Sequence, residues 1–277
     1  MKYIYDKLSN DISSKVMYEY STSFYWSTFL LDKKTKKAIY AVYAFVRLAD
    51  EIVDSFHDYN KKELMDNFER EFENSINNKI SLNPIFNSFQ KVYHDYNFNR
   101  DLVDSFLNSM KSDLVKSSFT EQKFDDYIYG SAEVVGLMCL KIFVKGDNDE
   151  YKRLKTYALK LGSAFQKVNF LRDINYDKKV LDRNYFSFLS KNKIDNKTKN
   201  KIIYDIKNDF EIALVGIKEL DKNVQFGVYT AYLLYKDLLY KIENKDASDL
   251  FKERISVFKS RKLFLILKSA FSINYKY

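Results

Sequence analysis

Apolar residues recur every three to four positions along most of the chain, which is the spacing of one face of an α-helix. Short polar stretches are expected to break this pattern between helices, at residues 32–37, 59–61, 77–84, 96–100, 145–150, 182–199 and 244–249. No stretch rich in Pro, Gly or Ser marks a boundary between domains. The pattern therefore predicts a single all-α domain over residues 1–277.

A polar stripe lies within the apolar residues 38–54. Read as one helix, this segment places its polar side chains at i, i+4, i+7 and i+11, and hence on a single face: Tyr43, Arg47, Asp50 and Asp54. The surrounding residues are mostly Ile, Val, Ala and Phe. Asp50 and Asp54, here called the first pair, are thus expected one turn apart on an otherwise apolar helix.

Residues 161–177 repeat this arrangement. Read as a helix, they place four polar side chains at i, i+3, i+7 and i+11: Gln166, Asn169, Asp173 and Asp177. Gly162 precedes this stripe by about one turn, at a position where another backbone is expected to come close. Asp173 and Asp177 are here called the second pair.

The spacing of two aspartates four residues apart is weak evidence by itself, because it occurs four times in this chain and about two occurrences are expected by chance. The other two, 54/58 and 205/209, lie among Lys, Asn and Tyr, and we interpret them as solvated faces or ion-pair networks. The first and second pairs differ from these because each belongs to a polar stripe inside an apolar helix.

Buried carboxylates without partners cost several kcal/mol or shift their pKa until they are neutral. Four acids around a common cavity would therefore require cations. Mg²⁺ suits them, since it takes oxygen ligands, keeps water molecules and is completed by substrate phosphates. Arg47 and Arg172 are then expected to donate to diphosphate oxygens, which a guanidinium matches in geometry.

At these residues the chain resembles the squalene/phytoene synthase family of head-to-head prenyl transferases. The resemblance covers both stripes, the Arg183-Asn-Tyr185-Phe186 that follows, a block at residues 127–136, and an N-terminal Tyr-Ser-Thr-Ser-Phe at residues 20–24. These blocks occur in the family's order over about residues 15–270. The N-x-x-R-D-x-x-x-D element that begins at Asn169 is highly specific. One position departs from the family: Glu133 stands where many members have glycine, either as an ion-pair partner or as a feature of the cavity.

The resemblance implies an isoprenoid-synthase-type helical bundle around a central cavity, with the two aspartate pairs facing each other. Two identical prenyl diphosphates would be joined in two steps. In the first step one diphosphate ionises and the double bond of the second molecule captures the cation, which gives a cyclopropylcarbinyl diphosphate. In the second step this intermediate ionises, rearranges and loses a proton. Two or three Mg²⁺ ions are expected and NADPH is not, because no glycine-rich dinucleotide loop is present.

The resemblance also assigns roles to individual residues. The expected Mg²⁺ ligands are Asp50, Asp54, Asn169, Asp173 and Asp177. The expected substrate-binding residues are Tyr20, Ser21, Thr22, Ser23, Tyr43, Arg47, Gln166, Arg172, Arg183, Tyr185, Tyr235 and Arg261. The four aspartates, with Arg47 and Tyr43, are the expected catalytic residues.

The form of the first motif is most similar to bacterial phytoene synthases, which join two C20 chains. Thr28 stands where dehydrosqualene synthases tend to carry an aromatic residue, and a smaller residue at the floor of the pocket would admit a longer chain. We therefore expect two geranylgeranyl diphosphates as substrates and phytoene, a carotenoid precursor, as the product. Dehydrosqualene or squalene synthesis from two farnesyl diphosphates is the alternative, followed by a terpene cyclase, a head-to-tail transferase or a non-enzymatic family member.

The net charge of +8 and the isoelectric point near 9.1 are compatible with a nucleic-acid or membrane partner, but Lys-rich and Asn-rich composition gives the same charge without one. Two acidic stripes argue against nucleic acid. Residues 252–277 carry seven Lys or Arg and one acid among apolar residues, and packing on the core is favoured over contact with an anionic membrane. Neither a secretory signal nor a span of about 20 apolar residues is visible, so we expect a cytoplasmic protein, with peripheral contact at the inner face of the membrane as an option. Cys139, in an apolar run, is expected to be a buried structural thiol.

Overall fold

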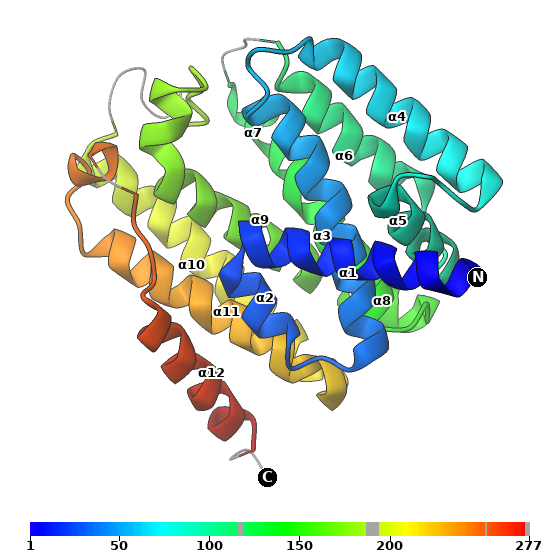
Figure 1. Cartoon of the computed structure of the whole chain (residues 1–277). Helices are drawn as coiled ribbons and strands as arrows, with labels where there is room; N and C mark the ends of the chain where they lie inside the picture. The colour runs from blue at the N-terminus through cyan, green and yellow to red at the C-terminus, as the bar shows by residue number, and fades with distance from the viewer. Residues whose placement is uncertain (116–118, 187–193, 253, 275–277) are drawn as a thin grey trace.

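The computed structural model describes residues 1–115, 119–186, 194–252 and 254–274 (Figure 1). These residues form helices and no strand, which confirms the predicted all-α fold class. The helices in chain order are α1 (Lys2–Tyr20), α2 (Thr22–Thr28), α3 (Lys33–Asp54), α4 (Lys61–Asn78), α5 (Pro84–Asp95), α6 (Arg100–Ser112), α7 (Glu121–Ile128), the π-helical turn η1 (Tyr129–Glu133), α8 (Val134–Phe143), α9 (Asn148–Lys179), α10 (Asn196–Glu219), α11 (Lys222–Glu243), the 3₁₀ turn η2 (Asp249–Phe251) and α12 (Lys259–Asn274).

Most predicted breaks coincide with connections between helices: 59–61, 77–84, 96–100, 145–150 and 244–249. The break at 32–37 was too long, because the Asp32 side chain caps α3 by accepting hydrogen bonds from two backbone N–H groups and the helix begins at Lys33. Other breaks were missed. Two fall at Ser21 and Asp221, whose side chains likewise cap the helices that follow, and no Pro or Gly marks either one. The others separate α6, which ends at Ser112, from α7, which begins at Glu121, and η2 from α12, which begins at Lys259. The break at 182–199 includes residues 187–193, which lie outside the described part.

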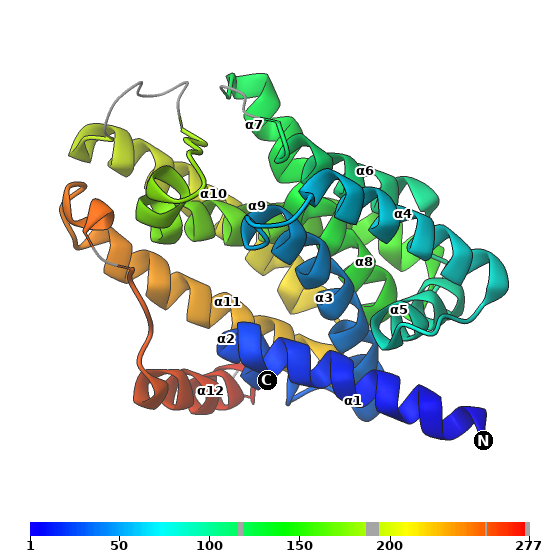
Figure 2. The ribbon, with the colours of Figure 1, turned by 45° about the horizontal axis from the view of Figure 1, so that its top comes forward.

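Two groups of buried apolar side chains hold the helices together. The first surrounds Phe45 of α3, whose ring stacks on Phe89 of α5 with 3.8 Å between ring centroids, and also involves α4, α6 and α8. The second joins α7, α9, α10 and α11. Figures 1 and 2 show α4, α5 and α6 on one side of the molecule and α10, α11 and α12 on the other, with α3, α8 and α9 between them. This arrangement places the two aspartate-bearing helices, α3 and α9, at the centre.

Glycines allow α9 to come close to its neighbours. A Cβ atom on Gly162 would lie 2.8 Å from the carbonyl oxygen of Ala132 in η1, and one on Gly136 of α8 would lie 2.9 Å from the carbonyl oxygen of Ala158. Neither contact would tolerate a side chain. The close backbone approach predicted at Gly162 is therefore confirmed, and it fixes how deeply the helix of the second pair sits against α8 and η1.

The C-terminal helix α12 packs one face on α11. Leu265 and Ser269 are buried, and the Ser269 hydroxyl lies 2.7 Å from the hydroxyl of Thr230. Its other face leaves Leu263, Phe264 and Leu267 more than half exposed. The packing predicted for this segment is thus confirmed for one of its faces. No helix in the described part of the chain is both long and apolar enough to cross a bilayer.

Phe45→Ala tests the packing that holds α3 in place. The Phe45 side chain is fully buried among four other phenylalanine rings besides Phe89, so its removal should lower the free energy of unfolding by about 3 to 5 kcal/mol in urea denaturation. Phe258→Ala is the matched control, because Phe258 is 73% exposed, and a change of less than about 0.5 kcal/mol is expected there. Equal losses in the two variants would contradict this account of the core.

Candidate active site

A cavity of about 470 Å³ lies between the two apolar groups, enclosed by α2, α3, α8, α9, α10 and α11. Most of its wall is apolar or aromatic. Polar side chains gather at one end, where both stripes predicted from the sequence meet. The predicted residues that line the cavity are Tyr20, Ser21, Tyr43, Arg47, Asp50, Asp54, Gln166, Asn169, Arg172, Asp173, Asp177, Tyr185 and Tyr235. Residues more than 100 positions apart in the sequence thus share one site.

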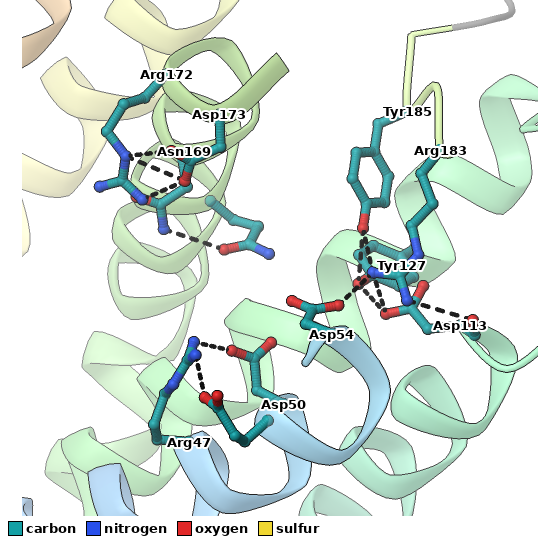
Figure 3. A network of polar contacts seen from close by, with 12 residues as sticks. Arg47, Asp50, Asp54, Asp113, Tyr127, Asn169, Arg172, Asp173, Arg183 and Tyr185 are labelled. Atoms are coloured by element: carbon teal, nitrogen blue, oxygen red, sulfur yellow. Dashed lines mark hydrogen bonds and ion pairs between the residues drawn. The ribbon is translucent and has the colours of Figure 1, made fainter. Parts of the chain in front are cut away.

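The first pair lies in the last two turns of α3. Arg47, one turn before Asp50, donates to the carboxylates of Asp50 and Glu51 (Figure 3). The Arg47 guanidinium also lies 4.4 Å from the centre of the Tyr20 ring. Asp54, the last residue of the helix, accepts a hydrogen bond of 2.6 Å from Arg183 Nη1. Each carboxylate of the first pair therefore has an arginine partner.

The second pair lies near the end of α9. The Asp173 carboxylate accepts hydrogen bonds from Nε of Arg172 at 3.0 Å and from Nε of Arg254 at 2.8 Å. Asp177 makes no side-chain ion pair within the described residues. The two pairs face the same cavity closely enough that the charge of Asp54 acts on Asp177.

Burial and mutual repulsion oppose ionisation of two of these acids. Burial, reinforced by the neighbouring Asp54, raises the pKa of Asp50 to about 7. Burial, followed by the charges of Asp173 and Asp54, raises the pKa of Asp177 to about 8. Burial also acts against Asp173, but its two arginine partners outweigh it and hold the pKa of Asp173 below its ordinary value. Both pairs also stand at helix C-termini, where the helix dipole disfavours negative charge.

Aromatic rings and amides cover the cavity wall next to the acids. The Phe165 and Tyr235 rings stack at 4.1 Å, and Phe24 packs on both. Asn169 accepts a hydrogen bond from the Tyr235 hydroxyl and donates one to Gln166, each at 3.3 Å. Burial raises the pKa of Tyr43 well above its usual range, so this phenol stays protonated. Neutral donors and ring faces therefore cover the part of the wall next to the acids and their arginines.

Four predicted substrate-binding residues do not line the cavity: Thr22, Ser23, Arg183 and Arg261. Arg261 Nε instead donates to Asp237 of α11 at 2.8 Å. The arginine of the C-terminal segment that does reach the cavity is Arg254, which contacts Asp173. The C-terminal segment thus reaches the cavity through Arg254 and not through Arg261, because the sequence does not show how the residues before α12 lie against α9.

Arg183 also lies beside the cavity lining, where it links several polar groups that the sequence did not connect. It donates to Asp54 and, at 3.3 Å, to the Tyr185 hydroxyl. Its third neighbour is Asp113, which follows α6 and accepts a hydrogen bond of 2.6 Å from the Tyr127 hydroxyl. Neither Asp113 nor Tyr127 was among the predicted site residues. Tyr127 belongs to a block matched to the family, whereas no sequence signal singled out Asp113.

Two smaller predictions concern the cavity wall. Glu133 is absent from the lining, and its charge interacts with Lys160 and Lys167, so the structure places it in an ion-pair environment. These lysines bind the buried Asp209 at 2.9 and 2.7 Å, as expected of an ion-pair network at 205/209. Cys139 does line the cavity, and burial raises the pKa of its thiol to about 12.

The oxygen donors of the site fit Mg²⁺ only if a bound phosphate group completes the coordination. All the candidate ligands are oxygens of acids or amides, which Mg²⁺ prefers. Among the residues that the structure describes, no three His, Cys, Asp or Glu side chains gather closely enough to hold a metal ion by themselves. The acids stand instead on two helices across a cavity, an arrangement in which phosphate oxygens would have to complete the coordination.

Comparison with known proteins gives a family for this chain. The model of the squalene/phytoene synthase family matches residues 17–189, more than half of the chain. The chain belongs to this family. Members of the squalene/phytoene synthase family are prenyltransferases, and this chain is one by its family.

Individual relatives are distant. Phytoene synthase 1 of Zea mays is 27% identical over 94% of this chain and 67% of its own length, and the 4,4'-diapophytoene synthase of Staphylococcus haemolyticus is 23% identical over 93% and 95%. The chain spans about two thirds of the length of the plant synthases. A crystal structure of a dehydrosqualene synthase superposes with a TM-score of 0.81 at 20% identity, over 97% of this chain and 98% of that one. That likeness establishes the shared fold.

Asp177→Asn tests the electrostatic strain at the second pair. An aspartate has a pKa near 3.9 when unfolded, and that of Asp177 is about 8 in the folded protein, so folding opposes its ionisation increasingly as pH rises from about 4 to about 8. Without metal, the stability advantage of the variant over the native chain should grow with pH across this window, by at most about 1.4 kcal/mol per pH unit, and should vanish below pH 4.

Urea unfolding in EDTA at several pH values measures this gain. Asp205→Asn on α10 is the control, since Asp205 is exposed. The free energies of unfolding of this variant and of the native chain should change with pH in parallel. A pH-independent difference between Asp177→Asn and the native chain would contradict the assignment of strain to Asp177.

Proposed function

We propose that this protein joins two molecules of geranylgeranyl diphosphate head to head, in a Mg²⁺-dependent reaction, to form phytoene. The observation that carries the proposal is the meeting of two partly buried aspartate pairs, each with its own arginines, at one end of an apolar cavity. A diphosphate attached to a long hydrocarbon chain has this same division into charged and apolar parts. The names of the plant relatives support the choice of product.

The chain's own residues would perform the binding and the ionisation. Arg47, Arg172 and Arg254 offer guanidinium donors at the polar end, where they would hold diphosphate oxygens and stabilise the leaving group. Mg²⁺, held by the first pair, the second pair and Asn169, would supply the further positive charge that the departing diphosphate requires.

The apolar wall would protect the cation that ionisation creates. Phe24, Phe165 and Tyr235 form a continuous aromatic cluster beside Asn169, and their ring faces attract positive charge while they exclude water. Tyr43, which packs on Phe24, keeps its proton and so adds no competing negative charge. The cation would then be captured by the double bond of the second substrate rather than by water.

The length of the substrate depends on the far end of the cavity. Thr28 is buried in this wall, and its hydroxyl donates to the carbonyl oxygen of Tyr25 at 2.8 Å. Because a phenylalanine here would extend into the cavity, the small residue favours C20 chains. Synthesis of a C30 product from two farnesyl diphosphates is the alternative, and one relative, from Staphylococcus haemolyticus, is named a 4,4'-diapophytoene synthase.

Incubation of the purified protein with Mg²⁺ and either diphosphate, with and without NADPH, tests the proposal. We expect phytoene from geranylgeranyl diphosphate without NADPH, and a loss of at least about 100-fold in rate in Asp50→Asn and in Asp173→Asn. Thr28→Phe should reduce the use of the C20 substrate more than that of the C15 substrate. Product from farnesyl diphosphate alone would refute the choice of substrate, and unchanged rates in the aspartate variants would refute the catalytic site.

We also propose that the outer face of α12 rests on an anionic membrane surface. Its exposed apolar stripe consists of Leu263, Phe264 and Leu267. Beside this stripe lie Lys259 and Lys268, which have no ion-pair partner among the described residues. The sequence contains no acid in residues 254–277. Apolar side chains flanked by lysines match the boundary between acyl chains and anionic headgroups. Lys262 of the same helix donates to Thr22, the first residue of α2, so α12 also contacts a helix that lines the cavity.

Flotation with vesicles tests this contact. The native chain should float with phosphatidylglycerol vesicles and less with phosphatidylcholine, and replacement of Leu263, Phe264 and Leu267 by Gln should reduce the bound fraction several-fold. Replacement of the exposed Ile80, Leu82 and Val115 by Gln is the matched control. Equal flotation of the two triple variants, or a dimer that dissociates only in the α12 variant, would overturn the proposal.

A further inference from the structure

Asp113 is a buried carboxylate next to the active site that the proposed chemistry does not use. It directly follows α6, and its side chain is only 4% exposed. One side of it accepts the hydrogen bond from Tyr127. On the other side, Arg183 Nη1 lies 3.6 Å from the Asp113 carboxylate, and Arg183 Nη2 donates to the Asp113 carbonyl oxygen at 3.3 Å (Figure 3).

Arg183 therefore has two carboxylate neighbours with different surroundings. Asp54 belongs to the first pair and faces the cavity, whereas Asp113 is absent from the cavity lining. The backbone N–H of Arg183 donates to the carbonyl oxygen of Asp177 at 2.9 Å. A single residue thus binds the first pair through its side chain and the end of the second pair's helix through its backbone.

We propose that Asp113 is a positioning residue that holds Arg183 when Asp54 is needed to bind Mg²⁺ and diphosphate. The inference rests on the proposed function, because it concerns the same acids. A buried guanidinium that loses its only carboxylate is left with an uncompensated charge, which is strongly unfavourable. Asp113 provides a second carboxylate for Arg183 on the side away from the cavity. Breaking the ion pair between Arg183 and Asp54 therefore requires less free energy.

Without Asp113, Asp54 would be the one carboxylate left to pair with Arg183 among the described residues. The guanidinium would then compete with Mg²⁺ for this carboxylate, and more Mg²⁺ would be needed to displace it. The effect must pass through Arg183. It should therefore vanish when Arg183 is already absent, which separates positioning by Asp113 from a general loss of negative charge near the site.

Thermal unfolding of the full chain with inorganic diphosphate and increasing MgCl₂ tests this proposal without any turnover. The variants are Asp113→Asn, Arg183→Gln and the double variant. Asp113→Asn should raise the Mg²⁺ concentration at half of the maximal shift in melting temperature by about tenfold, the loss of one charged hydrogen bond. The double variant should match Arg183→Gln within about twofold.

Asp104→Asn is the matched control, because Asp104 lies on the same helix α6 and does not line the cavity. Its carboxylate lies 2.6 Å from Arg100 Nε, so it too is paired with an arginine. Its Mg²⁺ midpoint should equal that of the native chain. An unchanged midpoint in Asp113→Asn, or effects of Asp113→Asn and Arg183→Gln that simply add, would overturn the proposal. If the native chain shows no shift at all with Mg²⁺ and diphosphate, the proposed function fails as well, which distinguishes the two failures.

Tyr127→Phe supplies the test if Asp113→Asn does not fold. This change keeps the ring and removes the hydroxyl that donates to Asp113 and so favours its charged form. A less charged Asp113 should attract Arg183 less, Asp54 should be bound more tightly by Arg183, and the Mg²⁺ midpoint should rise. An unchanged or lower midpoint in Tyr127→Phe would overturn the role of Asp113.

Discussion

The meeting of two partly buried aspartate pairs at one end of an apolar cavity is the constraint on which the site depends. Both pairs stand at the C-terminal ends of helices, so desolvation, mutual repulsion and the helix dipoles all disfavour their charge. Arginines compensate three of the four acids. Asp177 has no such partner in the described part of the chain, and its pKa is raised the most. The free protein therefore carries an unfavourable charge distribution that added cations would relieve.

The helices can maintain this arrangement because the rest of the fold holds them firmly. Phe45 anchors α3 in a cluster of aromatic rings a little over one turn before Asp50. Gly162 and Gly136 allow α9 to pack at backbone distance against η1 and α8. Apolar contacts far from the acids supply the free energy that offsets the unfavourable desolvation of the acids. Stability and function are thus assigned to different surfaces of the same two helices.

The arginines show how positive charge is distributed around the acids. Arg47 and Arg172 belong to the same helices as their partners, so their pairing is local. Arg183 and Arg254 come from connecting segments and reach an aspartate 129 and 81 residues away. The local arginines each pair with one acid of their own helix, Asp50 or Asp173, whereas the distant ones also connect the linking segments to the polar end of the cavity. Substrate and Mg²⁺ would alter these distant contacts first, because connecting segments are less constrained than helix interiors.

The sequence alone determined the helical class, the two stripes and the family, because helical periodicity and the N-x-x-R-D-x-x-x-D element are local patterns. It also identified Gly162 as a site of close approach. It did not reveal the helix starts at Lys33 and Lys222, which depend on single capping residues. Tertiary structure decided the rest. Only the packing before α12 shows that Arg254 rather than Arg261 reaches Asp173, and only the meeting of α6, α7 and the segment after α9 brings Asp113 to Arg183. These contacts join residues far apart in the chain, so no spacing within the sequence encodes them.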